Sequence, residues 1–326
     1  MNSPLAEQLR PQDLTEVVGQ DHLVGPSGFI TKIIQSKKPL SMILWGPPGS
    51  GKTSIARLYA KAFSLNFKNM SAIFSGIADI KKIIQDMNDT PLFGKQIVLF
   101  VDEIHRLPKA VEETLYPAME DFALDIVIGK GPSARTVRLD LPKFTLVGAT
   151  TRFGLLAGPF RDRFGIVHRL NYYQPPELIE ILQKAALKLD VSLTEEAVLA
   201  IAKRARGTPR IALKLLKRVR DYAQVKQLAI ISPAVAESAL QMLSIDSLGL
   251  DENERQFLEK IITKHNGGPI GLKTISATIH EDPGTIEEVL EPYLLQLGFV
   301  KRTPQGRVIT ESAYQYLHHP FPAQHQ

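Results

Sequence analysis

A glycine-rich segment at residues 46–53, Gly-Pro-Pro-Gly-Ser-Gly-Lys-Thr, constrains the fold of this chain more than any other feature. It follows the apolar run MILW at 42–45 and precedes SIARLYAKAF, whose apolar spacing is helical. Glycines in this strand–loop–helix context let backbone N–H groups turn toward a phosphate, and the helix N-terminus adds partial positive charge. The sequence therefore predicts a nucleotide-binding loop. The alternative is a plain glycine and proline turn ahead of a helix.

Individual residues of this loop have distinct expected roles. Lys52 is expected to reach the β and γ phosphate oxygens of ATP, and Thr53 is expected to ligate Mg²⁺. The other residues expected to contact the nucleotide here are Gly46, Gly49, Gly51 and Ser54.

A second candidate element is the pair of carboxylates that ends the apolar run IVLFV at 97–101. Carboxylates at the carboxyl edge of a parallel strand face the crevice where ligands bind. Asp102 is expected to hold magnesium, and Glu103 is expected to act as the general base that activates water. The alternative for the pair is a helix cap.

The run FTLVGATT at 144–151 predicts a third strand, with Thr150 and Thr151 placed to orient the same water. The alternative is that both threonines are ordinary β-branched residues of a strand, with no functional role. The loop GPFRDRFG then carries Arg161 and Arg163, which are poorly placed for their own chain's nucleotide. The functional interpretation is an arginine finger offered to a neighbouring subunit, and the alternative is an ion pair with Asp162.

The remaining patterns predict the domain organisation. An α/β domain with a parallel sheet is expected over 1–170, a small all-helical domain over 171–246, a winged helix over 247–318 and a tail over 319–326. The winged helix rests on three helical patterns followed by GFVKRTPQGRVIT, two strands around a turn. A further β-hairpin, LDIVIGKGPSARTVRLDL, is expected at 124–141.

Composition narrows the function classes. The chain has 326 residues, no cysteine and a net charge of +5, which excludes disulfides and thiolate metal sites and permits a nucleic-acid partner. Its apolar runs are far shorter than the ~20 residues that a bilayer crossing needs, so a cytoplasmic protein without a membrane partner is expected.

The phosphate loop, VDEIH, GATT, RDRFG and RGTPR together resemble the AAA+ ATPases, and long runs from residue 101 to about 317 resemble the RuvB family. This resemblance implies an ATPase that drives branch migration of Holliday junctions as a hexameric ring on duplex DNA, with RuvA and RuvC as partners. Residues 4–100 look closer to the RarA, or Werner-helicase-interacting, clamp-loader-like ATPases.

The resemblance also assigns residues. It implies that Arg210 is the sensor of the γ-phosphate and that Arg163, rather than Arg161, is the finger. The residues that it implies for the adenine pocket are Leu9, Arg10 and Tyr173, and those near the adjacent subunit's nucleotide are Glu120, Asp121 and Phe122.

Two segments are candidates for partner contact. The wing carries Lys301, Arg302 and Arg307, and the resemblance assigns DNA phosphate contact to the two arginines, although Gln305 and Pro283 stand where the family usually has arginine. Nine basic residues and a single acid between 203 and 226 permit phosphate contact or a solvated helix face.

The hairpin at 124–141 exposes Ile126 and Ile128, and the resemblance implies that it docks on RuvA. Packing on its own domain is the alternative. Two rival functions also remain at this stage. A RarA-like ATPase that remodels stalled replication forks would lack the hairpin, and a winged-helix regulator that uses ATP as a switch could dispense with Glu103.

Overall fold

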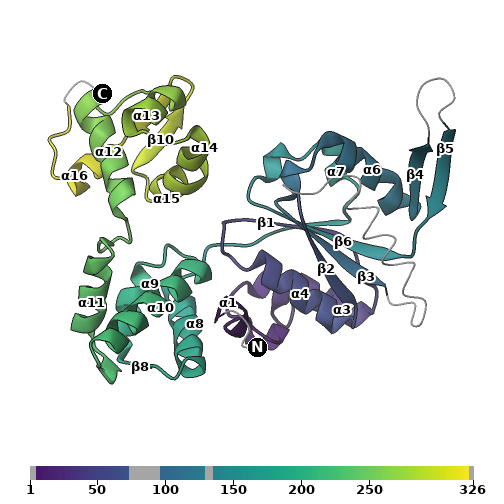
Figure 1. Ribbon diagram of the computed structural model, residues 1–326, viewed down its shortest axis with the longest axis horizontal. Helices are drawn as coiled ribbons and strands as arrows, with labels where there is room; N and C mark the ends of the chain where they lie inside the picture. Colours follow the sequence, from purple (N-terminus) through teal and green to yellow (C-terminus); the bar gives the residue numbers. More distant parts are fainter. Residues whose placement is uncertain (1–4, 73–95, 129–134, 323–326) are drawn as a thin grey trace. The chain divides into compact units, whose positions relative to one another are not determined.

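The computed structural model describes residues 5–72, 96–128 and 135–322, and the chain divides into two compact units (Figure 1). Unit 1 comprises Met1–Asp190 and Gly207–Leu213, and unit 2 comprises Val191–Arg206 and Lys214–Gln326. Each unit has its own buried apolar core, so each is described by itself.

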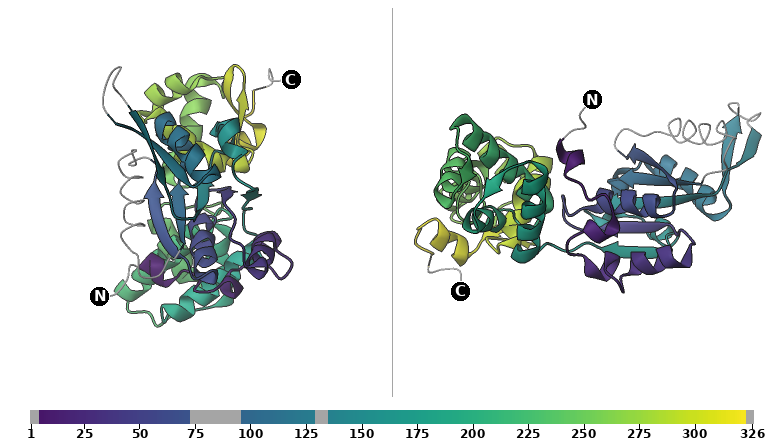
Figure 2. Two further views of the ribbon diagram at one scale, coloured as in Figure 1. Left: turned by 90° about the vertical axis from the view of Figure 1, so that its right-hand side faces the viewer. Right: turned by 90° about the horizontal axis from the view of Figure 1, so that it is seen from below.

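A five-stranded parallel sheet forms the centre of unit 1 (Figure 2). Its strands, in spatial order, are β2 (Asn66–Ser71), β3 (Ile97–Asp102), β6 (Phe144–Thr150), β1 (Met42–Trp45) and β7 (Ile166–Arg169). The predicted α/β class and the strands expected at 42–45, 97–101 and 144–151 are confirmed. The edge strands β2 and β7 were not predicted, because their partly exposed, polar residues give no continuous apolar run.

Side chains that alternate along β3 enter two different cores. Val98 and Phe100 pack with Ile55 and Tyr59 of α4 (Lys52–Ala62), while Leu99 and Val101 pack with residues of α6 (Lys109–Glu120). A parallel strand covered on both faces needs such a continuous apolar run. Other helices in the described part of unit 1 are α1 (Leu5–Gln8), η1 (Leu14–Glu16), α2 (Asp21–Val24), α3 (Phe29–Ser36), η2 (Ile104–Arg106), η4 (Phe153–Leu155), α7 (Gly158–Arg161) and α8 (Pro175–Lys188).

The predicted hairpin at 124–141 is present as β4 (Ala123–Ile128) and β5 (Arg135–Asp140), which pair antiparallel. Figure 1 shows it projecting beside α6, away from the central sheet. Its turn, GKGPSA at 129–134, lies outside the described residues. Ile126 and Ile128 are on β4, where only the backbone is described.

Unit 2 begins with helices that lie in the region predicted to be all-helical, 171–246. They are α9 (Glu195–Lys203), α10 (Pro209–Val225), whose first residues belong to unit 1, and α11 (Pro233–Met242); β8 (Ser192–Leu193) and β9 (Ile230–Ile231) form a small parallel pair. Thr194 and Ser232 cap α9 and α11 by accepting from backbone N–H groups three residues on. No helix in the described ranges combines the length and the apolar character that membrane crossing requires.

The predicted winged helix is confirmed at the end of unit 2. Its elements are α12 (Glu252–His265), α13 (Leu272–Ile279), α14 (Pro283–Thr285), the π-helical segment η5 (Ile286–Leu290), α15 (Glu291–Gln296), the wing strands β10 (Val300–Thr303) and β11 (Gly306–Ile309), and α16 (Glu311–Tyr316). Ile270 pairs with Arg307 of β11 and so extends the wing sheet by one bridge.

Candidate functional site

The pairing of β1 with β6 and of β6 with β3 brings three strand ends to one edge of the sheet. The phosphate loop follows β1, Asp102 and Glu103 follow β3, and Thr150 and Thr151 follow β6. Gly46 N donates to Thr150 O over 3.2 Å, which fixes the start of the loop against the end of β6. Residues about fifty positions apart in the sequence therefore lie at one edge of the sheet.

Lys52 is the first residue of α4 and is buried at 7% exposure. Its Nζ donates to the carbonyl oxygens of Gly46 (3.0 Å) and Pro47 (2.8 Å) in its own loop. Burial, helped by the charge of Arg210, lowers the pKa of the Lys52 ammonium to about 8, and the charges of Glu103 and Asp102 oppose this shift. The ammonium is thus held in the centre of the loop.

The loop backbone has the conformation that a phosphate cradle requires. Gly46, Gly49 and Gly51 adopt positive φ angles of 145°, 77° and 105°, which side-chain-bearing residues rarely tolerate. A Cβ at Gly46 would lie 2.4 Å from Leu170 O. The residues present therefore fit a nucleotide phosphate, with Thr53 beside the loop and Asp102 at the adjacent strand end available to magnesium.

Ser50 of the phosphate loop is fully buried. Its hydroxyl donates to Pro47 O (2.8 Å) and its carbonyl accepts from the hydroxyl of Tyr173 (3.0 Å). Burial raises the pKa of Tyr173 to about 12, and a hydrogen bond with Gln20 opposes that rise. Tyr173, predicted for the adenine pocket, is therefore anchored directly to the phosphate loop.

Gln20 belongs to this site although the sequence did not single it out. It has a left-handed backbone, 6% exposure, and an amide side chain that exchanges two hydrogen bonds of 2.9 Å with the backbone of Asn171. The turn after Gly19 is the only signal that could have drawn attention to it. The described contact of Arg10 is an ion pair with Glu7, which also pairs with Arg57 of α4. Leu9 lies in the turn after α1, half-buried.

Glu103 has a left-handed φ of 49°, and its carboxylate accepts from Thr151 Oγ1 over 3.3 Å. Nδ1 of His105 lies 3.3 Å from the same Glu103 oxygen and 2.8 Å from Thr150 Oγ1. Thr151 therefore contacts the carboxylate directly, whereas Thr150 reaches it through His105. The His105 side chain is 5% exposed and was missed from the sequence, although it stands two positions after Glu103.

Arg210, the predicted sensor, opens α10 and lies against the phosphate loop within unit 1. A Cβ at Gly49 would fall 2.6 Å from Arg210 Cβ, so the glycine makes room for the arginine. The turn that leads into α10, residues 207–210, is held by Tyr173, whose N–H donates to Gly207 O over 2.8 Å.

Arg163, the predicted finger, contacts residues of α6 and α7. Its guanidinium lies 4.2 Å from the ring centroid of Tyr116, forms an ion pair with Glu120 (3.1 Å) and donates to Pro159 O (2.6 Å). These side chains border a surface hollow of about 510 Å³ lined by Ala110, Glu113, Thr114, Tyr116, Pro117, Glu120 and Arg163. Arg161 instead stacks on Phe153, with its guanidinium carbon 5.3 Å from the ring centroid.

The three consecutive residues predicted near an adjacent nucleotide point in different directions. Glu120 pairs with Arg163, and Asp121 accepts from Arg138 of the hairpin over 2.6 Å. Phe122 has a left-handed φ of 51° and packs edge-on against Phe144 at 6.0 Å between ring centroids. Of the three, Glu120 alone contacts the predicted finger.

In the winged helix, the predicted DNA arginines are paired with acids. Glu291, with 0% side-chain exposure, accepts from Arg307 Nε (2.6 Å) and from Arg302 Nε (2.9 Å), and Arg307 also donates to Glu287 (2.9 Å). The Arg307 side chain is 14% exposed, whereas that of Arg302 is 49% exposed. Arg302 thus keeps a free surface, and Arg307 is mainly committed to this cluster.

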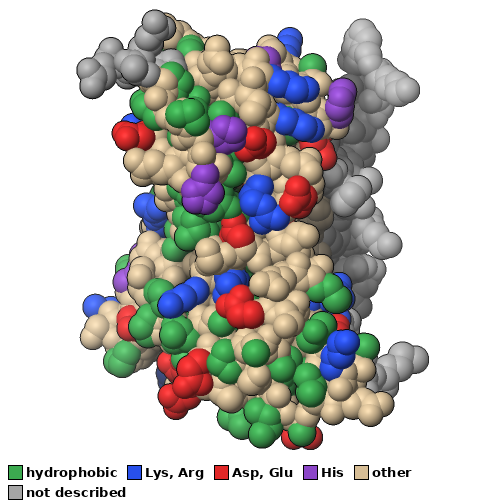
Figure 3. All heavy atoms as spheres, turned by 90° about the vertical axis from the view of Figure 1, so that its left-hand side faces the viewer, with side chains coloured by type: hydrophobic (Ala, Val, Ile, Leu, Met, Phe, Trp, Pro, Cys, Tyr) green, Lys and Arg blue, Asp and Glu red, His purple; other side chains and the backbone are tan. Residues whose placement is uncertain are grey.

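The basic stretch at 203–226 is also divided. Arg204 and Arg206 bond within unit 2, and Arg220 bonds to Asp221, whereas Lys214, Lys217 and Arg218 are exposed. On the face drawn in Figure 3, Lys and Arg side chains lie among Asp and Glu side chains and do not merge into one basic stripe. The exposed Lys214, Lys217 and Arg218 fit both alternatives, phosphate contact and a solvated helix face.

Comparison with known proteins places all three parts of the chain in one family. The model of the Holliday junction DNA helicase RuvB P-loop domain matches residues 9–170, that of the RuvB AAA lid domain matches 173–246, and that of the RuvB C-terminal winged helix domain matches 247–318. The chain belongs to the RuvB family. It is a P-loop ATPase of the AAA+ class.

Solved RuvB structures agree with this placement. The chain is 41% identical to the RuvB Holliday junction branch migration motor of Thermotoga maritima, with a TM-score of 0.84 over 97% of this chain and 100% of that one. A mutant form of the same protein matches at 41% identity and a TM-score of 0.85, over 96% of this chain and 100% of the other.

The RuvB match includes most of the segment that had looked closer to RarA. The P-loop domain model begins at residue 9 and continues without a break through 170, so the RarA alternative is not favoured.

The wing contacts generate a stability prediction. Replacing Arg307 with Met should lower the free energy of unfolding by about 3 kcal/mol, because breaking a buried ion pair leaves the Glu291 carboxylate undercompensated. Denaturant unfolding followed by circular dichroism measures this change. The control is Lys301→Met, an exposed neighbour whose loss should change stability by less than about 0.5 kcal/mol. Unchanged stability in Arg307→Met, with loss of DNA binding, would assign Arg307 to DNA instead.

Proposed function

We propose that this RuvB-family chain hydrolyses ATP at the subunit interfaces of a hexameric ring and drives branch migration of Holliday junctions during recombination and DNA repair. The observation that carries the proposal is that the buried Lys52, the Asp102–Glu103 pair and Thr151 lie at adjacent strand ends on one edge of the sheet. The related Thermotoga maritima protein is described as a branch migration motor. A cytoplasmic ring on duplex DNA is part of the proposal.

In this proposal the loop residues bind the nucleotide. Backbone N–H groups around Gly46, Gly49 and Gly51 cradle the phosphates, together with Ser54 at the start of α4. Lys52 leaves the carbonyl oxygens of its loop for the phosphate oxygens, which offer the ammonium a stronger, charged partner. Tyr173, Leu9 and Arg10 form the adenine side. Magnesium, held by Thr53 and Asp102, supplies charge neutralisation to the phosphates when bound.

Glu103 is proposed as the base that accepts a proton from the attacking water. Its left-handed backbone turns the carboxylate toward the β6 edge, where Thr151 donates to it and His105 lies against it. A base fixed from two sides loses less orientational freedom when the water arrives. Thr150 supports this arrangement through His105.

Arg163 is proposed to act on the nucleotide of the adjacent subunit. Its contacts in this chain are with α6 and Pro159, which hold the guanidinium ready at the surface. An arginine supplied across an interface stabilises the charge that spreads over the transferring phosphoryl group. Glu120, its ion-pair partner, would lie at the same interface, next to Asp121 and Phe122. Arg210 is the sensor within the chain.

The winged helix and the β4–β5 hairpin, which lie apart from the nucleotide site in the sequence, would bind partners. Residues 1–170 form the large ATPase domain, 171–246 the lid and 247–318 the DNA-binding winged helix, followed by a tail at 319–326. Arg302, half exposed on β10, is the stronger phosphate contact, and Arg307 supports it through Glu291. The β4–β5 hairpin is proposed to dock on RuvA through Ile126 and Ile128, and RuvC is a further partner of the assembled complex.

A winged-helix regulator that uses ATP only as a switch is the remaining rival. Such a switch has no need for an oriented base, whereas Glu103 is held by two neighbours here. The fixed Glu103 favours the motor.

Substitutions of Lys52 and of Glu103 should have different effects on ATP binding and on ATP hydrolysis. Lys52→Ala should abolish ATP binding, because it removes the charge that meets the phosphates, whereas Glu103→Gln should bind ATP and stop hydrolysis. Fluorescent-nucleotide titration and phosphate release measure the two properties. Normal turnover in Glu103→Gln would remove Glu103 from the role of base.

The finger should act in trans. Arg163→Ala should bind ATP and lose on the order of a thousandfold in turnover. Mixing it with Lys52→Ala, which cannot bind nucleotide but still presents a finger, should restore partial ATPase activity at interfaces that combine an intact site with an intact finger. Mixed rings that are shown to form but stay inactive would contradict the assignment.

Disruption of the hairpin should impair stimulation by RuvA and leave ATP hydrolysis largely intact. Ile128→Glu should leave ATP hydrolysis on linear duplex DNA largely unchanged and eliminate stimulation by RuvA, because a docking contact that buries an unpaired charge loses several kcal/mol. Junction unwinding with and without RuvA provides the measurement. Undiminished RuvA stimulation would show that the hairpin packs on its own domain.

A further inference from the structure

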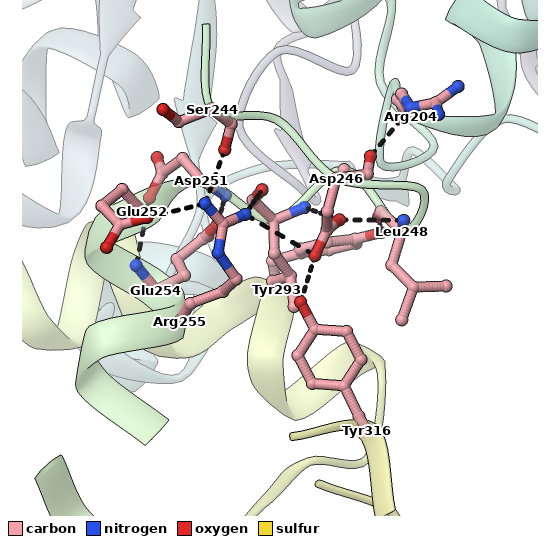
Figure 4. A network of polar contacts seen from close by, with 12 residues as sticks. Arg204, Ser244, Asp246, Leu248, Asp251, Glu252, Glu254, Arg255, Tyr293 and Tyr316 are labelled. Carbon is pink, nitrogen blue, oxygen red and sulfur yellow. Dashed lines mark hydrogen bonds and ion pairs between the residues drawn. The ribbon is translucent and has the colours of Figure 1, made fainter. Parts of the chain in front are cut away.

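The segment that joins α11 to α12, residues 244–251, is bonded from two sides within unit 2 (Figure 4). Asp246 organises it: one carboxylate oxygen accepts from the backbone N–H groups of Leu248 (2.9 Å) and Leu250 (2.8 Å). The other carboxylate oxygen accepts from the hydroxyl of Tyr316 in α16. A connection between domains is commonly solvated and loosely held, whereas this one has a fixed set of polar partners.

The winged helix supplies one group of these partners. Arg255 of α12 donates to Leu250 O (3.0 Å) and to Ser244 O (2.9 Å), at opposite ends of the connection. The hydroxyl of Tyr293 in α15 donates to Leu248 O over 2.5 Å. Together with Tyr316, these side chains hold the connection against the winged helix.

The lid supplies the second group through two arginines that follow α9. Arg204, 8% exposed, donates to Asp246 O (2.8 Å) and to Glu237 of α11 (2.8 Å). Arg206 donates twice to Gly249 O, at 2.9 and 2.6 Å. Both arginines therefore bind the connection from the side of the lid helices.

Arg206 also reaches past the connection into the winged helix. Its guanidinium forms two parallel hydrogen bonds with the Glu254 carboxylate, at 2.6 and 2.7 Å, and lies 4.7 Å from the ring centroid of Tyr293. Glu254 is 1% exposed, so its charge depends on this partner. Burial raises the pKa of the Glu254 carboxyl, and Arg206 opposes that rise. This paired geometry fixes orientation as well as distance.

We call the paired contact between Arg206 and Glu254 the clamp. Arg206 also lies close in the sequence to the candidate γ-phosphate sensor, Arg210. The chain passes from unit 2 to unit 1 between Arg206 and Gly207, and the next residues lead to Arg210 beside the phosphate loop. Gly207 is itself bonded to Tyr173. Three residues, Gly207 to Pro209, thus separate the candidate γ-phosphate sensor Arg210 from Arg206.

We propose that Arg206, acting through Glu254, ties the winged helix to the lid helices α9–α11 so that they move as one body, and passes displacements of the Gly207–Arg210 turn to the DNA-binding domain. Arg206 is a positioning residue and touches neither nucleotide nor DNA. The coupling part of this proposal rests on the proposed motor function.

The absence of cysteine from the sequence permits a direct distance measurement. Lys217→Cys on α10 and Lys264→Cys on α12 place spin labels at two exposed positions of unit 2 in the full-length chain. Pulsed electron spin resonance should give a narrow distance distribution that is the same without nucleotide and with a non-hydrolysable ATP analogue. A broad distribution, or one that shifts with nucleotide, would overturn the single-body proposal.

Glu254→Gln added to the labelled protein should broaden that distribution, because the neutral amide keeps one acceptor oxygen and loses both the charge and the paired geometry. The matched control is Glu252→Gln on the same helix, whose 55% exposed side chain pairs only at the surface with Arg255, and it should leave the distribution narrow. If Glu254→Gln does not fold, Arg206→Lys, which keeps the charge and loses the paired geometry, is measured in its place. An unchanged distribution in the variant measured would exclude the clamp.

Coupling has a separate readout in the same variant. Glu254→Gln should keep its DNA-independent ATP turnover within about twofold and lose at least tenfold in junctions processed per ATP hydrolysed, a ratio that a merely stabilising contact would not change. An unaltered ratio would refute the transmission role. A parent protein with a narrow distance distribution that hydrolyses ATP and moves no junction would instead refute the proposed function alone.

Discussion

The parallel pairing of β3, β6 and β1 is the constraint on which the rest of this structure depends. Because β6 lies between the other two strands, the loop after β1, the carboxylates after β3 and the threonines after β6 end at neighbouring points of one edge. The register is held by side chains buried on both faces of the sheet, such as Val98 and Leu99 on β3. A shift of one strand by a single residue would exchange these two faces and move the carboxylates away from the loop.

Three of the buried charges, on Lys52, Glu254 and Glu291, are compensated in two different ways. Lys52 is surrounded by backbone carbonyls, which satisfy its hydrogen bonds without neutralising its charge, and its ammonium remains available to a stronger anionic partner. Glu254 and Glu291 are instead neutralised by arginines, Arg206 in one case and Arg302 with Arg307 in the other. The first arrangement prepares a binding site, and the second fixes the geometry of the winged helix.

Surface arginines in this chain also show why charge alone does not identify a binding residue. Arg307 and Arg302 stand opposite each other on the wing, yet one side chain is 14% exposed and the other 49%. Arg163 and Arg161 are separated by one residue, and only Arg163 pairs with Glu120 beside the hollow on α6. The partner available within the chain decides which guanidinium remains free for another molecule.

Local pattern was sufficient to predict the phosphate loop, the strands over 42–45, 97–101 and 144–151, the hairpin and the winged helix, because each depends on hydrophobic period and on turn chemistry among nearby residues. The edge strands β2 and β7, the approach of Gln20 to Tyr173, and the contact of His105 with Glu103 could not be predicted in this way. The same holds for the clamp between Arg206 and Glu254, which are 48 residues apart in the sequence. These features depend on which distant segments pack together, and only the tertiary structure decides whether a charged side chain is solvated, paired or buried.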